Sequence, residues 1–555
     1  MRDEVQKLLE AAAERVLREH APDSLALVST LVVVPGKTVE HGDFASNAAL
    51  ALAKPMRRPP RAVAELLQAA LLDESGVLER TEIAGPGFLN FFLARNRWHA
   101  VISRILREGE SFGRSDAGQG RPVMVEFVSA NPTGPLTIGH GRNAVLGDCI
   151  ARLLEATGHK VTREYYFNDA GRQMRVLAQS LRARYLQLLG DAAELPDEGY
   201  QGEYLVEIAR ALVEEVGEGF RSADESRFRE RAVGAIFAEI EQTLTSLGVR
   251  FDSYFNEHTL FERGLVETTI ADLRARGLVF EQEGAVWLRS TGFGLERDRV
   301  LVKSTGEATY LLPDVAYHRE TLQRGFETVI DVLGPDHIAQ FPYVKSALEA
   351  LGCDAGRVEL VMYQWVNLRQ AGELVKMSTR AARFVSVDEV LAKVGRDVFR
   401  YFMVERRADT HLDFDLDLAA ERSDRNPVYK VQYAHARLSS ILRKAADEGL
   451  VLASDPVGLP LHLLVSPEEI ELAKLLGRWP DTVRHAADER EPQEIARYLL
   501  ELANGFNTYV SDGKRHRVVS QDRDLSSARL ALVSAVRIAL ASGLGLLGIE
   551  APERM

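Results

Sequence analysis

The stretch VEFVSANPTGPLTIGHGR, residues 125–142, holds the pattern that decides the fold of this chain. An apolar run at 123–128 leads into a loop rich in Pro and Gly, and a helical pattern follows from about Gly141 to Thr157. A second strand-like run at 161–167 and a second helix at 172–189 extend this into a β-α-β-α series. Such a series predicts a parallel sheet with right-handed crossovers.

Further apolar runs at 328–333 and 358–365 are typical of buried strands and predict that the same sheet continues downstream. The stretch from about 190 to 280 is mostly acidic and amphipathic, which predicts a helical insertion. We therefore expect one sheet domain over 120–425, interrupted by that insertion.

The segments on either side of the sheet domain differ from it in pattern. Residues 1–110 mix helical stripes with short β-branched runs and predict an α+β domain, which a charged, Gly-rich linker at 108–121 follows. From Asn426 onward helical periodicity dominates, so an all-α domain is expected over 426–555.

Length and charge limit the classes of protein to consider. The 555 residues suggest roughly three or four domains at ~150 residues each. There are 68 basic and 81 acidic residues, and the resulting net charge of −13 argues against a protein that coats nucleic acid non-specifically. A local basic surface remains compatible with this charge.

Cysteine usage and apolar runs indicate the compartment. Two cysteines give no basis for a disulfide scaffold or a cysteine-rich zinc site, which favours a reducing cytoplasm. The most apolar stretch, 530–549, carries Ser534, Arg537 and Ser542, and the N-terminus lacks an apolar signal core. The chain is expected to be neither membrane-bound nor secreted.

The loop at 129–140 lies where a strand passes into a helix, and such a junction suits anions. Backbone N–H groups at a helix start are unpaired and the dipole there is positive, so a phosphate can approach closely where Gly removes the Cβ. His140 adds a directional donor. Taken alone, Ile138-Gly139-His140 is more often only the start of a helix.

A second segment, LVKMSTR at 374–380, follows the predicted strand at 358–365. Lys376 offers a compact charge and Ser378 a rotatable hydroxyl, and together they can neutralise charge on a departing pyrophosphate. Taken alone, this segment is more often a solvated loop.

Together the two segments resemble the paired "HIGH" and "KMSKS" signatures of class I aminoacyl-tRNA synthetases, in the same order. Further blocks narrow the resemblance to the arginyl-tRNA synthetase family and cover the chain from residue 42 to 555. These blocks are GDFASN at 42–47, GPGFLN at 85–90, SANPTGP at 129–135, TYLLPD at 309–314, VQYAHAR at 431–437 and APERM at 551–555.

The resemblance implies an α/β Rossmann-like parallel-sheet catalytic domain, an N-terminal α+β domain that contacts the tRNA elbow, and a C-terminal all-α helical bundle that binds the anticodon. It implies that L-arginine is activated with ATP and transferred to the terminal adenosine of tRNA-Arg. Mg²⁺ is expected to arrive with ATP, without a metal held by the protein alone. A cytoplasmic monomer that binds no membrane is expected.

The same resemblance assigns roles to individual residues. A guanidinium is planar and permanently cationic, so its pocket should offer carboxylates and a flanking ring. The arginine-binding residues implied are Glu126, Asn131, His140, Tyr310, Asp314 and Gln340. Those implied for ATP and catalysis are Thr137, Gly139, His140, Gly141, Lys376, Met377 and Ser378.

RNA loops are read by stacking on aromatic rings and by hydrogen bonds to base edges. Tyr433 also fits a helical core stripe, and the basic cluster Lys514–Arg517 also fits a solvated charge run. The tRNA contacts implied are Phe88, Asn90 and Phe92 for the elbow, and Tyr429, Tyr433, Asn507, Tyr509 and Met555 for the anticodon.

Two departures from the signatures leave alternatives open. Thr137 replaces the first histidine, so activation is expected to depend on His140 and Lys376, and Arg380 is expected to supply charge missing at Thr379. The alternatives are a synthetase for another amino acid, a small-molecule adenylyltransferase without RNA, and a non-catalytic tRNA-binding paralogue.

Overall fold

The computed structural model describes residues 1–555 except 37, 170, 376–384 and 453–455. The described chain divides into two units, each assembled from separate segments. Unit 1 contains Met1–Phe112, Arg437–Trp479 and Asn504–Ala539, and unit 2 contains Gly113–Ala436, Pro480–Ala503 and Leu540–Met555.

The N-terminal part of unit 1 is an antiparallel sheet of four strands, in the order β1-β2-β4-β3, with helices beside it. The first helix buries one apolar stripe that includes Val5, Leu9 and Val16, as its spacing predicts. The α+β prediction for this part is confirmed. Its elements are α1 (Arg2–His20), β1 (Val33–Pro35), β2 (Phe44–Ser46), α2 (Ala48–Met56), α3 (Pro60–Ala69), β3 (Leu78–Ala84), β4 (Phe88–Leu93) and α4 (Arg95–Glu108).

Four long helices make up the C-terminal part of the chain, and the described residues after 426 contain no strand, as predicted. Each of the four boundaries between units in this region falls inside a helix. The last helix is long and apolar enough to span a bilayer, but 72% of its most apolar window is buried, as in the core of a helical domain. The helices are α16 (Pro427–Asp447), α17 (Pro467–Asp488), α18 (Gln493–Ser511) and α19 (Arg523–Leu546).

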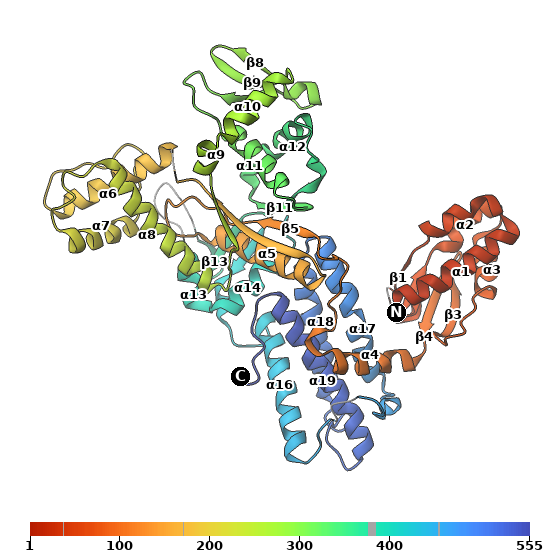
Figure 1. The fold of residues 1–555 in the computed structure, drawn as a ribbon. Helices are drawn as coiled ribbons and strands as arrows, with labels where there is room; N and C mark the ends of the chain where they lie inside the picture. The colour runs from red at the N-terminus through yellow and green to blue at the C-terminus, as the bar shows by residue number, and fades with distance from the viewer. Residues whose placement is uncertain (37, 170, 376–384, 453–455) are drawn as a thin grey trace. The chain divides into compact units, whose positions relative to one another are not determined.

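Unit 2 is built on a parallel sheet of five strands in the order β12-β11-β5-β6-β7. The predicted strand, loop and helix at 123–157 is confirmed as β5, a loop and α5, and both later apolar runs form strands (Figure 1). Nearly the whole circumference of α5 is buried. The elements are β5 (Pro122–Glu126), α5 (Ile138–Ala156), β6 (Lys160–Phe167), α6 (Gly171–Leu188), β7 (Ser253–Asn256), β11 (Thr328–Leu333), α12 (Phe341–Ala350) and β12 (Val358–Met362).

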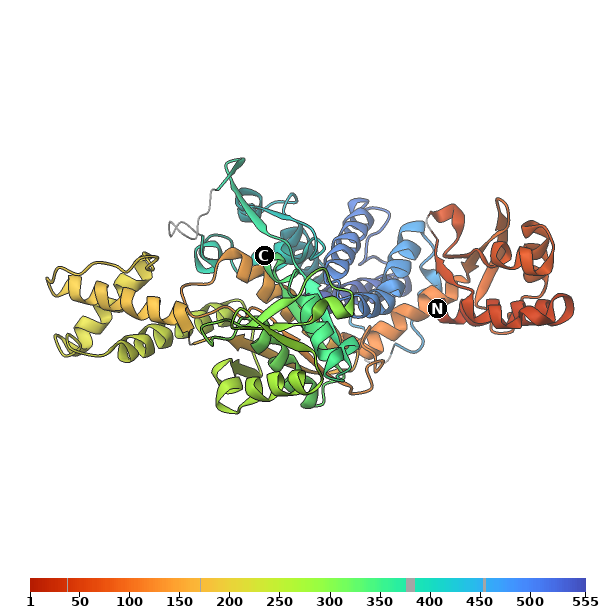
Figure 2. The ribbon, with the colours of Figure 1, turned by 90° about the horizontal axis from the view of Figure 1, so that it is seen from above.

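The stretch from 190 to 280 is helical at first, where α7 (Glu203–Val216) and α8 (Glu225–Ser246) pack against α6 (Figure 2). It is not helical throughout, because β7 returns the chain to the parallel sheet. Four residues are too few to show a period-2 pattern, and this explains why the sequence did not predict the strand.

Smaller elements complete unit 2, among them two sheets of three strands, in the orders β10-β9-β8 and β14-β13-β15. A capping box between Ser386 and Glu389 starts α13. The elements are α9 (His258–Glu262), α10 (Leu265–Ala275), β8 (Val279–Gln282), β9 (Ala285–Leu288), β10 (Arg299–Val302), α11 (Leu311–Gln323), β13 (Val366–Gln370), β14 (Glu373–Leu374), α13 (Val387–Val394), α14 (Arg396–Val404), β15 (Leu412–Asp415) and α15 (Leu416–Ala420).

Candidate active site

The parallel sheet changes direction of winding between β5 and β11. From β5 the chain crosses to β6 and β7 on one side, whereas β11 and β12 lie on the other. Crossovers that leave in opposite directions open a crevice at the carboxyl ends of the strands, where ligands bind in sheets of this kind. Asn143 of α5 joins these two strand ends, because it accepts from Val128 N–H and donates to the Val332 carbonyl, both at 2.9 Å.

The N-terminus of α5 opens at this crevice. Thr137 is the N-cap and forms a capping box with His140. The Thr137 N–H donates to His140 Nδ1 at 3.2 Å, so in a neutral ring the proton lies on Nε2. Burial lowers the pKa of His140 to about 4, which keeps the ring neutral near pH 7.

The chain returns to this helix start just after residue 384. Ile138 N–H donates to the Val385 carbonyl at 3.3 Å, and Val387 N–H donates to the Leu136 carbonyl at 2.9 Å. Residue 385 therefore lies beside the first turn of α5. The predicted residues Lys376, Met377 and Ser378 lie outside the described residues.

The turn after β5 has an unusual backbone. Val128 has φ +68° and Ser129 has φ +44°, in the left-handed region that side chains with a Cβ rarely adopt. The Ser129 hydroxyl donates to Glu126 and accepts from Tyr166 N–H at 3.1 Å. Strain of this kind is found where a surrounding structure holds a functional loop in place.

Both predicted carboxylates lie near His318 and Asp331, whose charges act on each of them. Glu126 ends β5 and is 5% exposed, and Asp314 lies in the first turn of α11. Burial, and then the charge of Asp331, raise the pKa of Glu126 to about 8. Burial raises the pKa of Asp314 to about 7 against the opposing charge of His318. Both groups are thus prepared to receive a cation that would compensate their charge.

The remaining residues predicted to bind arginine differ in how firmly the structure holds their side chains. Gln340, the N-cap of α12, donates from Nε2 to Asp314 Oδ2. Tyr310, the N-cap of α11, is 68% exposed, so its ring is not fixed by packing. The Asn131 amide donates to Gln173 at 3.1 Å and accepts from Asn168 N–H at 3.2 Å, which ties the loop after β5 to the end of β6.

Asp331 and His318 belong to the same cluster, and sequence reasoning missed both. Asp331 of β11 is the register partner of Glu126 on β5, so both side chains leave the same face of the sheet. His318 Nε2 lies 2.8 Å from Asp331 Oδ2, and His318 Nδ1 lies 2.7 Å from the Asp314 carbonyl oxygen. The available signals were a lone carboxylate in an apolar strand and a histidine one helical turn after Asp314.

The residues predicted to contact the tRNA elbow lie on β4. Phe88 is 42% exposed, and the guanidinium of Arg80 lies 3.6 Å from the centre of the Phe92 ring. Asn90 is buried and pairs with its neighbours in the sheet. The exposed face of this strand is therefore aromatic, and the Asn90 side chain does not take part in it.

The predicted anticodon residues divide between the units. Tyr429, Tyr433 and Met555 lie in unit 2, and Asn507 and Tyr509 lie in unit 1. Tyr429 and Tyr433 stack with ring centres 6.1 Å apart and planes 8° apart. Tyr509 is fully buried against His516, so its ring is not presented to a partner in this structure.

A groove of about 750 Å³ in unit 2 is lined in part by the half-buried Tyr429. Its lining joins the Tyr429 ring and two amides with three basic and three acidic groups, and the acidic ones are Asp397, Glu421 and Glu550. Its lining residues include Lys393, Arg396, Arg422, Asn426, Tyr429, Gln432 and Met555.

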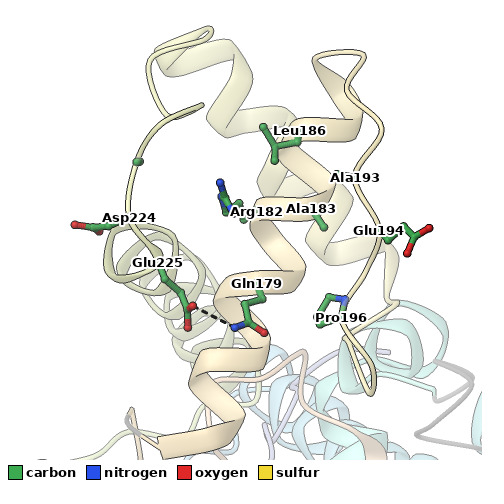
Figure 3. Close-up of a pocket in the computed structure, with 10 residues that line it drawn as sticks. Gln179, Arg182, Ala183, Leu186, Ala193, Glu194, Pro196, Asp224 and Glu225 are labelled. Carbon is green, nitrogen blue, oxygen red and sulfur yellow. Dashed lines mark hydrogen bonds between the residues drawn. The ribbon is translucent and has the colours of Figure 1, made fainter.

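A separate cavity of about 530 Å³ lies between α6 and the start of α8. Figure 3 shows Arg182 between carboxylates, with Gln179 hydrogen-bonded to Glu225 at 3.2 Å. None of the predicted site residues that the structure describes lines this cavity. Its surroundings are more acidic than basic, which does not suit a phosphate or nucleic acid.

Comparisons with known proteins cover almost the whole chain. Residues 3–93 match the model of the arginyl tRNA synthetase N terminal domain, 101–415 that of the class I (R) tRNA synthetase catalytic domain, and 431–555 that of the DALR anticodon binding domain. The chain is 50% identical to an arginine–tRNA ligase of Desulfotalea psychrophila over 93% of each chain, and 44% identical to one of Geobacillus kaustophilus over 99% of each. It resembles the solved arginyl-tRNA synthetase of Thermus thermophilus with a TM-score of 0.76 and 26% identity, over 100% of each chain.

Proposed function

The chain belongs to the arginine–tRNA ligase family, and from this premise we propose that its crevice between β5 and β11 activates L-arginine with ATP and charges tRNA-Arg. The observation that carries the proposal is the two carboxylates with raised pKa values, Glu126 and Asp314, which share His318 and Asp331 as charged neighbours at the strand end that leads into α5. An acidic pocket next to an anion-binding helix start fits a substrate with a cationic side chain and a reaction with a triphosphate.

For arginine, Glu126 and Asp314 accept hydrogen bonds from the guanidinium, whose planar fork suits carboxylates. Gln340 already donates to Asp314 and holds that carboxylate in place. The exposed Tyr310 ring can close over the guanidinium as a cation–π partner. Asn131 and His140 orient the backbone groups of the substrate.

For ATP, which is bound as its Mg²⁺ complex, the first turn of α5 supplies the phosphate site. His140 donates from Nε2, and Gly139 and Gly141 allow the helix start to approach a ligand and its own neighbours closely. The N-cap bond of Thr137 to His140 supports a positioning role, and a direct bond from Thr137 to phosphate stays a prediction.

The second ATP segment is proposed at Lys376, Met377 and Ser378. The support is that residues 385–387, which follow it in the chain, pair with Leu136 and Ile138 at the start of α5. Lys376 and Ser378 would neutralise charge on the departing pyrophosphate.

In the proposed reaction the arginine carboxylate attacks the α-phosphorus of ATP and pyrophosphate leaves. The ribose hydroxyl of the terminal adenosine of tRNA then attacks the arginyl-adenylate and releases AMP. Neither step forms a covalent bond to the protein, so its residues contribute positioning and charge stabilisation.

We place the enzyme in the cytoplasm as a monomer that does not bind membranes.

For tRNA, the groove beside Tyr429 is the proposed anticodon site, with Tyr433 and Met555. Asn507 is proposed as a further contact, and the buried Tyr509 is proposed to support the helix that carries both residues. The ring of Tyr433 is exposed beside that of Tyr429 and suits stacking with a base, and Lys393 and Arg422 of the groove suit contacts with phosphates. Phe88 and Phe92 are proposed at the tRNA elbow, where Asn90 would act by supporting the strand. The proposed domains keep the expected ranges of 1–110, 120–425 and 426–555.

ATP–pyrophosphate exchange tests the function. Arginine should support exchange when tRNA-Arg is present, because the family commonly couples activation to tRNA. The other standard amino acids serve as controls for specificity. If a different amino acid supported exchange and arginine did not, the assignment of the pocket to a guanidinium would be wrong.

Gly139→Ala should raise the KM for ATP about tenfold without loss of stability. Apart from its chain neighbours and its own helix backbone, the nearest described atom to an added Cβ is Thr137 Oγ1 at 3.8 Å, and Ala favours helix by about 1 kcal/mol over Gly, so the described structure leaves room for the methyl group that a bound phosphate would meet. Gly141→Ala is the matched control, since its Cβ would lie 2.6 Å from Phe399 Cζ and should lower the melting temperature. An unchanged ATP KM in Gly139→Ala would place the phosphates elsewhere.

Tyr433→Ala should raise the KM for tRNA about tenfold and leave the KM for arginine unchanged, because one base–aromatic stack contributes about 1–3 kcal/mol. Aminoacylation at varied tRNA concentration gives the measurement. Tyr433→Phe keeps the ring and should behave as the wild type. A fall in melting temperature with an unchanged tRNA KM would instead identify the ring as a packing group.

A further inference from the structure

The buried pair of His318 and Asp331 has no part in the roles proposed above. Asp331 is 1% exposed, and its Oδ1 has no hydrogen-bond partner among the described residues. Its Oδ2 takes a hydrogen bond from His318. The other ring nitrogen of His318 contacts a backbone carbonyl, which can only accept. With an ionised Asp331, both ring nitrogens must therefore carry protons, and the ring is an imidazolium.

The groups that face His318 come from three elements. Asp331 lies on β11, Glu126 lies on β5, and Asp314 and the Tyr317 ring lie on α11 itself. Burial lowers the pKa of His318, but the charge of Asp331 and its hydrogen bond outweigh burial and raise the pKa to about 9. The imidazolium in turn lowers the pKa of both Glu126 and Asp314, against the burial that raises them.

We propose that His318 is a positioning residue of the arginine pocket. Its fixed positive charge favours the ionised forms of Glu126 and Asp314, so that fewer protons leave these carboxyl groups when arginine binds. The inference rests on the proposed binding of arginine by Glu126 and Asp314. A guanidinium binds carboxylates well only when they are ionised. A buried cation beside them favours their ionisation, and the hydrogen bond to Asp331 holds that cation in place.

Calorimetric titration of the full chain with L-arginine between pH 5.5 and 9.5 tests this inference. Wild-type affinity should climb through about pH 7–8, since the pKa values of Asp314 and Glu126 are about 7 and 8. His318→Gln keeps an N–H donor toward Asp331 but loses the charge. The midpoint of the pH dependence of its arginine affinity should shift upward by about one pH unit. Its affinity should be about tenfold weaker than that of the wild type at pH 6 and equal to it at pH 9.

The double variant His318→Gln/Asp331→Asn removes both charges and leaves no unpaired buried ion. The midpoint of its pH dependence should therefore return toward the wild-type value. Asp148→Asn is the matched control, because it breaks another buried ion pair, with Arg400, away from the pocket. It should lower the melting temperature without changing the midpoint of the pH dependence of arginine affinity.

Equal weakening of arginine binding at every pH in His318→Gln, or an upward shift that persists in the double variant, would overturn the inference. A wild-type chain that binds no arginine at any pH would contradict the proposed function instead. The two failures are therefore distinguishable. If His318→Gln alone does not fold, an upward shift of the pH midpoint in the double variant would still overturn the inference.

Discussion

Asp314→Ala should raise the KM for arginine about a hundredfold and leave the KM for ATP almost unchanged. The substitution removes one of the carboxylates proposed for the guanidinium and deprives Gln340 of its acceptor. Breaking a buried charge contact costs about 3–5 kcal/mol, and about 1.4 kcal/mol corresponds to tenfold. Steady-state exchange at varied arginine and varied ATP gives the two constants separately.

Asp272→Ala provides the matched control for Asp314→Ala. Asp272 pairs with Arg319 of α11 and is 40% exposed, so its loss should change activity and stability little. A comparable rise in the KM for both substrates of Asp314→Ala would indicate a general collapse of the site. An unchanged arginine KM would place the guanidinium away from α11.

His140→Ala should lower kcat about 100- to 1,000-fold, while the KM for arginine changes far less. The Nε2–H of His140 is the donor proposed for the reacting phosphate, and loss of one such donor costs this much in other enzymes. The measurement is pre-steady-state formation of arginyl-adenylate. Thr137→Ser keeps the N-cap hydroxyl and should retain most of the activity, which separates the donor from the helix start that holds it.

The same residue predicts an effect of pH on stability. The folded pKa of His140 is about 4 and the ordinary value is 6.5, so the unfolded chain binds more protons in this interval. The contribution of neutral His140 is complete above pH 6.5 and is lost as the pH falls toward 4. His140→Ala lacks this loss, so its melting temperature should fall less steeply over the interval. If the melting temperatures of the wild type and of His140→Ala fell in parallel with pH, the pKa of the ring would not be lowered by folding.

The local pattern predicts the framework of the sheet because each element carries its own signal. Strand, Pro/Gly loop and helix at 123–157 appear in the structure as β5, the loop and α5. Through family resemblance the sequence also identifies Glu126, Asp314 and Gln340, which the structure brings to one crevice. Their proximity depends on the order of the strands, which no local pattern contains.

What the sequence did not predict depends on long-range register. Asp331 faces Glu126 only because β11 pairs with β5, and His318 acquires its role only from Asp331. Burial of Asn90 and Tyr509 is equally non-local, since a strand or helix position gains its neighbours from distant segments. Polar and aromatic residue types thus suggest ligand contacts, whereas the fold decides which of them meet solvent.

The division of the chain has a consequence for its biosynthesis and engineering. The chain passes between the units after residues 112, 436, 479, 503 and 539. On the ribosome, the unit that contains the N-terminus stays incomplete until residue 539 has been made. A truncation after residue 425 would deprive it of two of its three segments, and a swap of the N-terminal or C-terminal third between relatives would separate residues that fold together. Chimaeras of this enzyme therefore need complementary exchanges at several points of the sequence.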